Sequence, residues 1–303
     1  MPHLHGENIK DRYPNQTMEL LIERASCRDF SNKKIPPHVL QLIIEAGIHA
    51  PTGGNLQPYS IIKIEDNDTK QKLAELGMQS FITKAPVALL FCIDWRRIER
   101  WASLEDAPFT ATSSFRHFWI SFIDTVICAQ NICTAADSMG LGSVYIGTVI
   151  NLLTDIRDMF KLPKGVFPVI LVCMGYPKVR LQPQKKLGID IVVHSERYHE
   201  IQDEELTNAF NKKYRDYREK FEITKERLEM IFKVCKEVHG EEFAKKCVGR
   251  IKENGYINTA QYYFGLHYRA NLMPTENDAF LRIMKEFGFD WFKKYHPHKN
   301  TCA

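Results

Sequence analysis

Two short and almost wholly apolar runs, residues 86–93 and residues 166–174, constrain the fold of this chain more than any other feature of its sequence. Each run is much shorter than the about 20 residues that a helix needs to cross a bilayer. Apolar runs of this length are typical of strands that are buried on both faces of a sheet. The sequence therefore predicts buried strands and no membrane segment, in a chain of 303 residues that is long enough for a large core.

Hydrophobic spacing predicts further elements around these two strands. Residues 96–116 have no regular period and combine polar with aromatic side chains, which predicts a surface excursion or lid. Additional strands are expected at residues 59–64 and 143–146, and helices at residues 18–23, from Pro37 onward, and at residues 70–77, 118–139 and 152–160.

The composition changes near His194. From about Asp203 the chain is dense in Lys, Glu, Phe and Tyr, which predicts helices with breaks at Gly240, Gly255 and Pro274. We therefore expect two parts: an α+β domain over residues 1–200 and a helical C-terminal extension over residues 201–303.

Charge and cysteine usage exclude several classes of protein. The net charge is +4 without a dense Lys/Arg block, so no nucleic-acid partner is expected. Residues 1–10 lack the apolar centre of a secretory signal, and the eight cysteines are scattered, mostly within apolar runs. Both features favour reduced thiols and a cytoplasmic location. No metal site is expected, because His296, His298 and Cys302 cluster without a regular ligand spacing.

Residues 50–59 form a loop between an expected helix and an expected strand. Gly53 and Gly54 let the backbone approach a ligand closely. The amides of Asn55 and Gln57 both donate and accept hydrogen bonds, which suits the polar edge of a flat heterocycle. Taken alone, the segment is equally typical of an ordinary turn.

Arg24, Ser26 and Arg28 alternate along the chain. In an extended segment they project to the same side, where two guanidinium groups and a hydroxyl would bind a phosphate. The alternative is a solvated charged strand, paired with acids such as Glu23 and Asp29.

Two other segments allow a binding role. Residues 145–148 lie at a strand end, where Gly147 can present a backbone N–H group to a ligand. Lys185 and Lys186 precede an apolar run at residues 189–193, expected as a strand, and can supply positive charge to a phosphate. The alternatives are a plain turn and an exposed lysine pair.

In this order, the segments resemble the flavin-dependent nitroreductase family. The chain has no P-loop, GxGxxG or GxSxG motif that would favour a different enzyme class. The resemblance rests on Arg24-Ala25-Ser26-Cys27-Arg28-Asp29-Phe30 for an Arg-x-Ser-x-Arg-x-Phe signature, residues 50–59 for an Ala-Pro-Ser/Thr-x-x-Asn-x-Gln-Pro loop, residues 129–142 for a central helix and its turn, residues 160–177 for the last core strand, and residues 192–198 for the ending of an NADPH-preferring subgroup.

The resemblance implies an α+β, three-layer sandwich around a mixed, mostly antiparallel sheet. It also implies an obligate homodimer with FMN at the interface. The residues it assigns to FMN are Arg24, Ala25, Ser26 and Arg28 at the phosphate and ribityl chain, Pro51, Thr52, Gly53, Asn55 and Gln57 along the ring, Tyr145, Ile146, Gly147 and Thr148 on its other side, and Lys185 and Lys186 at the phosphate.

By resemblance, NADPH or NADH would pass hydride to N5 of the flavin, and a nitroaromatic, quinone or related acceptor would then remove it in a ping-pong cycle. No catalytic side chain is required. One alternative is a specialised flavin enzyme for dehalogenation or flavin breakdown. Another is a flavin-binding sensor or partner-docking protein that acts through the C-terminal helices.

Overall fold

The chain forms two compact units in a computed structural model that describes residues 12–215 and 221–293. The first unit comprises Met1–Pro183 and Phe280–Ala303, and the second comprises Gln184–Ala279. The sequence-based boundary at residue 200 groups the whole C-terminal third together. In the structure, the last part of that third contributes to the first unit.

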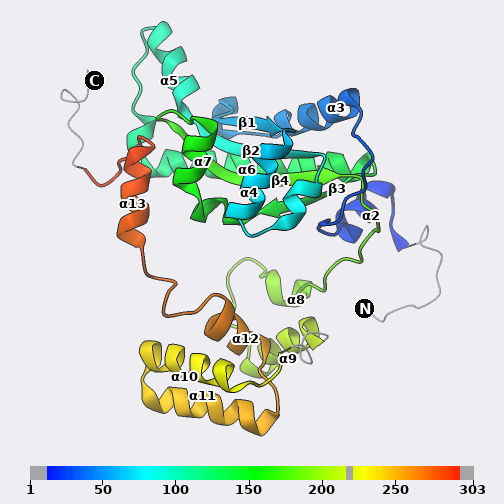
Figure 1. Cartoon of the computed structure of the whole chain (residues 1–303), viewed down its shortest axis with the longest axis vertical. Coiled ribbons are helices and arrows are strands. Elements are labelled where there is room, and N and C mark those ends of the chain that lie inside the picture. Colours follow the sequence, from blue (N-terminus) through cyan, green and yellow to red (C-terminus); the bar gives the residue numbers. More distant parts are fainter. Residues whose placement is uncertain (1–11, 216–220, 294–303) are drawn as a thin grey trace. The chain divides into compact units, whose positions relative to one another are not determined.

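A four-stranded sheet forms the centre of the first unit (Figure 1). Its order is β1-β2-β4-β3, and all three pairings are antiparallel. The two apolar runs become the central strands, as predicted, and nearly all their residues are buried. The strands are β1 (Tyr59–Ile64), β2 (Val87–Asp94), β3 (Gly142–Ile146) and β4 (Val166–Gly175).

Each face of the sheet packs against helices. Along β2, Leu89 and Phe91 enter one core cluster, while Leu90 and Cys92 enter the other, as the two-residue period of a strand requires. The predicted α+β sandwich is therefore confirmed. The first cluster is covered by α3 (Pro37–Ile48) and α6 (Phe115–Ser138), and the second by α4 (Asn67–Leu76), the short helix η2 (Ser80–Lys84) and α7 (Leu153–Phe160).

Helix α6 is the main helix of its layer. The Ser114 side chain accepts a hydrogen bond from the His117 N–H group and caps the helix. A Cβ atom at Gly47 would lie 2.2 Å from Ile132 Cγ1, so only glycine allows α3 to approach α6 this closely. Among the described helices, α6 alone is long and apolar enough to cross a membrane by length and composition. Its packing in the sandwich accounts for that composition.

The expectation of an irregular segment over residues 96–116 is wrong in its first half. Residues Trp95–Leu104 form helix α5, which begins directly at the end of β2 (Figure 1). The Asp94 carboxylate accepts a hydrogen bond from the Arg97 N–H group at 2.9 Å and caps the helix. Trp95, Ile98 and Ala102 recur at helical spacing on its inner side, a pattern that the neighbouring charges obscure in the sequence.

The C-terminal helix α13 (Asn277–Glu286) leads back into the core of the first unit. Phe287 and Phe289 are each only 1% exposed. Their rings pack edge-to-face against Phe167 and Phe118, with centroids 5.2 and 5.3 Å apart respectively. This segment therefore completes a hydrophobic core that the first 183 residues leave open.

The second unit is helical, as expected. Gly240 and Gly255 end its two longest helices, as predicted, and both have positive φ angles. Residues 189–193 were expected as a strand, but residues Ile189–Val192 form the short helix α8. The other helices among the described residues of this unit are α9 (Asp203–Lys213), α10 (Lys225–His239), α11 (Glu241–Asn254), α12 (Thr259–Tyr262) and the π-helical turn η6 (Tyr263–His267).

Candidate functional site

The predicted ring-binding loop has an unusual backbone conformation. Gly54, Asn55 and Gln57 have φ angles of 61°, 54° and 48°, in the left-handed region that residues other than glycine rarely adopt. Residues 51–56 are largely exposed. Because an exposed loop would relax out of this conformation if nothing held it, its contacts with the rest of the fold matter.

A buried carboxylate holds the first part of this loop. The Gly53 N–H group donates to both carboxylate oxygens of Asp124 on α6, at 3.2 Å each. Asp124 is only 5% exposed. Burial raises the pKa of this carboxyl group, and the Gly53 N–H group opposes that shift.

A guanidinium group holds the last part of the loop. Arg97 Nη2 donates to the carbonyl oxygens of Gln57 and Tyr59, at 2.6 and 2.8 Å. Gln57 Nε2 in turn donates to the carbonyl oxygen of Ile48 at 2.9 Å. The Gln57 amide therefore helps to hold the loop and is only partly exposed. The side chain of Asn55 is exposed.

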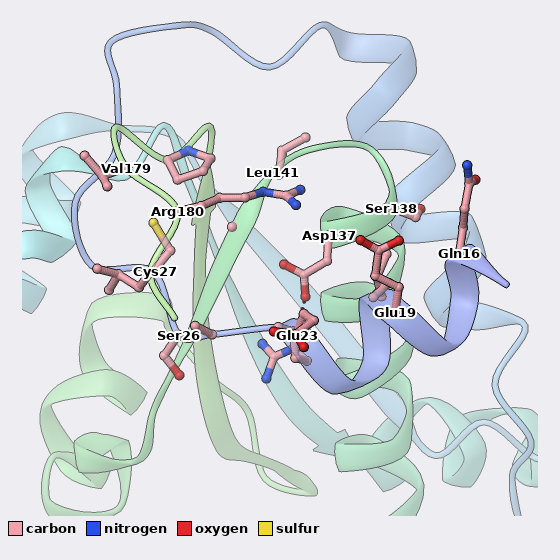
Figure 2. Close-up of a pocket in the computed structure, with 16 residues that line it drawn as sticks. Gln16, Glu19, Glu23, Ser26, Cys27, Asp137, Ser138, Leu141, Val179 and Arg180 are labelled. Carbon is pink, nitrogen blue, oxygen red and sulfur yellow. Dashed lines mark hydrogen bonds and ion pairs between the residues drawn. The ribbon is translucent and has the colours of Figure 1, made fainter. Parts of the chain in front are cut away.

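The predicted phosphate-binding segment lines a pocket of about 330 Å³. Arg24, Ala25 and Ser26 contribute to its wall, and Figure 2 shows Ser26, Asp137 and Arg180 around it. Carboxylates also line this pocket, so its lining is of mixed charge. Arg28 is not part of the lining.

Arg24 and Arg28 have separate surroundings. Arg24 Nε donates to Asp137 at 3.0 Å, and Nη2 donates to Ser143 Oγ at 3.3 Å. Burial raises the pKa of Asp137, and the Arg24 guanidinium opposes that shift. Arg28 is exposed, with its guanidinium 6.0 Å from the ring centre of Phe81. The structure thus brings Arg24, Ala25 and Ser26 together without Arg28.

The predicted residues 145–148 lie where β3 ends. Tyr145 donates its hydroxyl hydrogen to Gln130 Oε1 at 3.3 Å, and Ile146 is buried in the core. Gly147 is exposed, and a Cβ atom there would meet nothing within 4 Å. Thr148 Oγ1 accepts a hydrogen bond from Gln79 Nε2 at 3.0 Å. The backbone at Gly147 therefore borders open space on a fixed strand end.

One helix anchors all three segments. Along α6, Asp124 holds Gly53, Gln130 bonds Tyr145, and Asp137 pairs with Arg24. At 1.5 Å per residue, Asp124 and Asp137 lie about 20 Å apart along the helix. The loop that precedes β1 and the strand β3 also belong to opposite edges of the sheet. Within one chain, these segments are therefore spread over more than half of the length of α6.

Known proteins match this chain in sequence. The profile of the family described as "Nitroreductase family" matches residues 21–176, just over half of the chain. The NADPH-flavin oxidoreductase of Vibrio harveyi is 32% identical over 188 residues, which is 62% of this chain and 76% of that protein. The oxygen-insensitive NADPH nitroreductase of Salmonella typhimurium is 31% identical over 202 residues, 66% of this chain and 82% of that protein.

The chain belongs to the nitroreductase family. Solved structures agree with this assignment. NfrA2 of B. megaterium aligns with a TM-score of 0.70 at 26% identity, over 92% of this chain and all of that chain. The NADPH:FMN oxidoreductase of Vibrio harveyi, complexed with NAD+, aligns with a TM-score of 0.63 at 29% identity, over 67% of this chain and 86% of that chain. The share of this nitroreductase that aligns with NfrA2 is larger than the share that the family profile matches.

Lys185 and Lys186 belong to the second unit of the nitroreductase chain, and their assignment to a phosphate stays a prediction. The histidines and the cysteine near the C-terminus, at positions 296, 298 and 302, lie outside the described residues. Within residues 12–215 and 221–293, no group of three or more His, Cys, Asp or Glu side chains is placed to hold a metal.

The sequence reasoning assigned no role to the side chains that hold the predicted site. Asp124 and Asp137 are the only acidic residues of α6, a helix that is otherwise mostly apolar. That isolation was a usable signal, because a buried carboxylate must find hydrogen-bond donors. Arg97 carried no such signal. It is one of several charged residues in a segment for which the sequence did not predict a helix.

Proposed function

We propose that this nitroreductase is an FMN-dependent NAD(P)H oxidoreductase that acts as a homodimer with FMN at the interface. The loop over residues 51–57 is the observation that carries the proposal. It is exposed, left-handed at three positions, and held by Asp124 and Arg97 on either side. The names of the Vibrio harveyi and Salmonella typhimurium relatives, which specify NADPH and flavin or NADPH and nitroreduction, support the same reaction class.

The donor groups of this chain fit FMN. Arg24 uses Nε and one Nη2 hydrogen in its contacts with Asp137 and Ser143, which leaves guanidinium N–H groups for a phosphate. Ser26 in the same pocket adds a hydroxyl. The open space beside Gly147 suits a flat ring that approaches the backbone closely.

The proposed site needs a second copy of the chain. The ring-lining loop and β3 belong to opposite edges of one sheet, so in a dimer the loop of one copy would meet the β3 edge of the other. An apolar stripe on the outer side of α6 supports this arrangement, because large exposed apolar patches mark interfaces. The stripe consists of Phe115, Trp119, Ile120, Ile123 and Ile127.

When bound, FMN would supply hydride transfer between a reduced nicotinamide and a nitroaromatic, quinone or related acceptor. The residues of this chain would bind and orient it. Arg24 and Ser26 would contact its phosphate, and the assignments of Arg28, Lys185 and Lys186 to that phosphate stay predictions from the sequence. Asn55, Gln57 and the Gly147 backbone would fix the edge of the ring. No side-chain nucleophile is needed for this chemistry.

A cytoplasmic location is part of the proposal. The cysteines of the described residues are all free thiols, which supports it.

The absorbance spectrum of the purified protein, followed by anaerobic titration with NADPH, tests the proposal. We expect a flavin spectrum that bleaches on titration and returns when an acceptor is added. The double substitution Arg24→Ala/Arg28→Ala should abolish flavin retention, while Lys72→Ala/Lys84→Ala, which removes two exposed charges elsewhere, should retain it. A yellow protein that neither bleaches with NADPH or NADH nor turns over any acceptor would contradict the oxidoreductase and favour a binding role.

A further inference from the structure

A second cavity lies in the first unit, beside α5 and away from the pocket at Arg24. Its volume is about 490 Å³, within the range of small-molecule sites. It runs between α5, β1 and the segment that joins α7 to β4. None of the residues assigned to FMN lines it. We call it the α5 groove.

The α5 groove is strongly basic. Three arginines, Arg96, Arg97 and Arg100, line it together with a single acid, Asp94. Asp94 is already engaged, because its oxygens accept hydrogen bonds from the Ser60 hydroxyl and the Arg97 N–H group. Both of its oxygens therefore already have donors within the protein, and the three arginines outnumber it in the lining.

Two of these arginines have no counter-charge within the described part of the chain. Arg96 and Arg100 are exposed, and their guanidinium groups form no ion pair or hydrogen bond with the described residues. Arg97 differs, because it donates to the carbonyl oxygens of Gln57 and Tyr59. Two guanidinium groups on consecutive turns of one helix thus face solvent with unused donors, an arrangement that suits a carboxylate, sulfonate or phosphate.

The groove also presents flat and apolar surface beside these charges. Trp101 is 55% exposed and Leu104 is 81% exposed, although both are large apolar side chains that water solvates poorly. Phe160, at the end of α7, lines the same groove. The groove therefore combines a cationic side with an aromatic one, and a purely inorganic anion would use only the first.

We propose that the α5 groove binds a small amphipathic anion, a flat apolar ring system that carries one acidic group. The acidic group would lie between Arg96 and Arg100, and the ring would pack on Trp101. Arg97 would connect this site to the loop over residues 51–57, because the same guanidinium lines the groove and holds the loop carbonyls. The proposal does not rest on the FMN assignment, because its ligand contacts come from Arg96, Arg100 and Trp101, none of which is assigned to FMN.

Calorimetric titration of the full-length protein with 2-naphthoate tests this site. We expect saturable binding of one molecule per chain. Arg96→Gln/Arg100→Gln should weaken binding about tenfold or more, because it removes both charge-assisted contacts. Trp101→Leu should weaken it several-fold through loss of the flat aromatic face. Lys72→Gln/Lys84→Gln, which removes the same charge from exposed positions elsewhere, should leave the affinity unchanged.

Two further ligands define the chemistry. 2-Naphthyl phosphate compared with 2-naphthoate distinguishes a phosphate site from a carboxylate site, and 2-naphthalenemethanol provides the ring without the charge. Equal binding of the alcohol, or equal affinity of the arginine double variant and the wild type, would overturn the proposal. A wild-type protein that binds none of the three ligands would also overturn it. In that case, light scattering would show whether Arg96→Gln/Arg100→Gln dissociates into monomers. That outcome would instead make the groove an interface between copies.

Discussion

At the scale of single residues, Asp124 is the side chain on which the predicted flavin loop most depends. It is a carboxylate inside an apolar helix, and its described partner is the backbone N–H group of Gly53. Burying a charge is unfavourable unless hydrogen bonds compensate, so the fold retains Asp124 against its own desolvation. The hydrogen bonds from Gly53 compensate for part of this cost, and through them Asp124 positions the loop.

We expect Asp124→Ala to weaken FMN binding about tenfold to a hundredfold, because a hydrogen bond to a charged group contributes about 1.5–3 kcal/mol. Asp124→Asn keeps one acceptor oxygen for the Gly53 N–H group and should restore most of the affinity. Flavin fluorescence during dilution measures the dissociation constant. Asp68→Ala, on the exposed first turn of α4, is the control. Equal affinities of the alanine and asparagine variants would show that the hydrogen bond does not position the loop.

At the scale of elements, α6 has two apolar sides, of which one is buried and the other is exposed. Its inner side is buried against the sheet and α3, with Cys128, Ile132 and Ala136 fully covered. Its outer side exposes the stripe that includes Trp119 and Ile123. The same helix carries the three polar contacts to the predicted site segments. A change on its outer side is therefore expected to affect assembly and flavin binding together.

Substituting Ile123→Glu should convert the dimer into monomers, because it places a charge in the centre of the proposed interface. The flavin should be lost with the dimer, since each site would need both copies. Size-exclusion chromatography with light scattering measures the mass, and absorbance measures the flavin. Leu76→Glu, a comparable change on the exposed side of α4 in the opposite layer, should leave both unchanged. A monomer of Ile123→Glu that retains stoichiometric flavin would refute a site shared between copies.

At the scale of the whole molecule, the first compact unit is built from two segments that are not consecutive in the sequence. The second unit is inserted between Pro183 and Phe280, and the chain then returns to complete the core of the first unit. Met284, Phe287 and Phe289 are almost completely buried there. Each buried phenylalanine contributes about 3–5 kcal/mol relative to alanine, against a total stability of about 5–15 kcal/mol for a typical protein.

Truncation after Tyr198 should therefore prevent folding of the first unit, because it removes these core side chains. Internal deletion of residues 184–279, with a long Gly/Ser linker in their place, should leave a cooperatively unfolding protein. Circular dichroism during thermal unfolding distinguishes the two variants. If the truncated chain unfolded with the same midpoint as the internal deletion, the C-terminal segment would not be part of the core.

Sequence patterns predicted the elements whose signal is local. The spacing of apolar residues and the positions of Gly and Pro located all four strands, α3, α6 and the breaks at Gly240 and Gly255 to within a few residues. Charges within α5 concealed its apolar side, and the short run at residues 189–193 did not distinguish strand from helix. These two errors share a cause, because a short segment takes its structure from the surface against which it packs.

The sequence by itself determined the α+β class, the helical C-terminal third and the segments that match the nitroreductase family. Only the tertiary structure decided that Asp124 holds Gly53, that Arg97 holds Gln57, and that Phe287 closes the first core. The physical reason is distance along the chain. Periodicity and capping act between residues a few positions apart, whereas these contacts join residues that meet only after the sheet and its helices have packed.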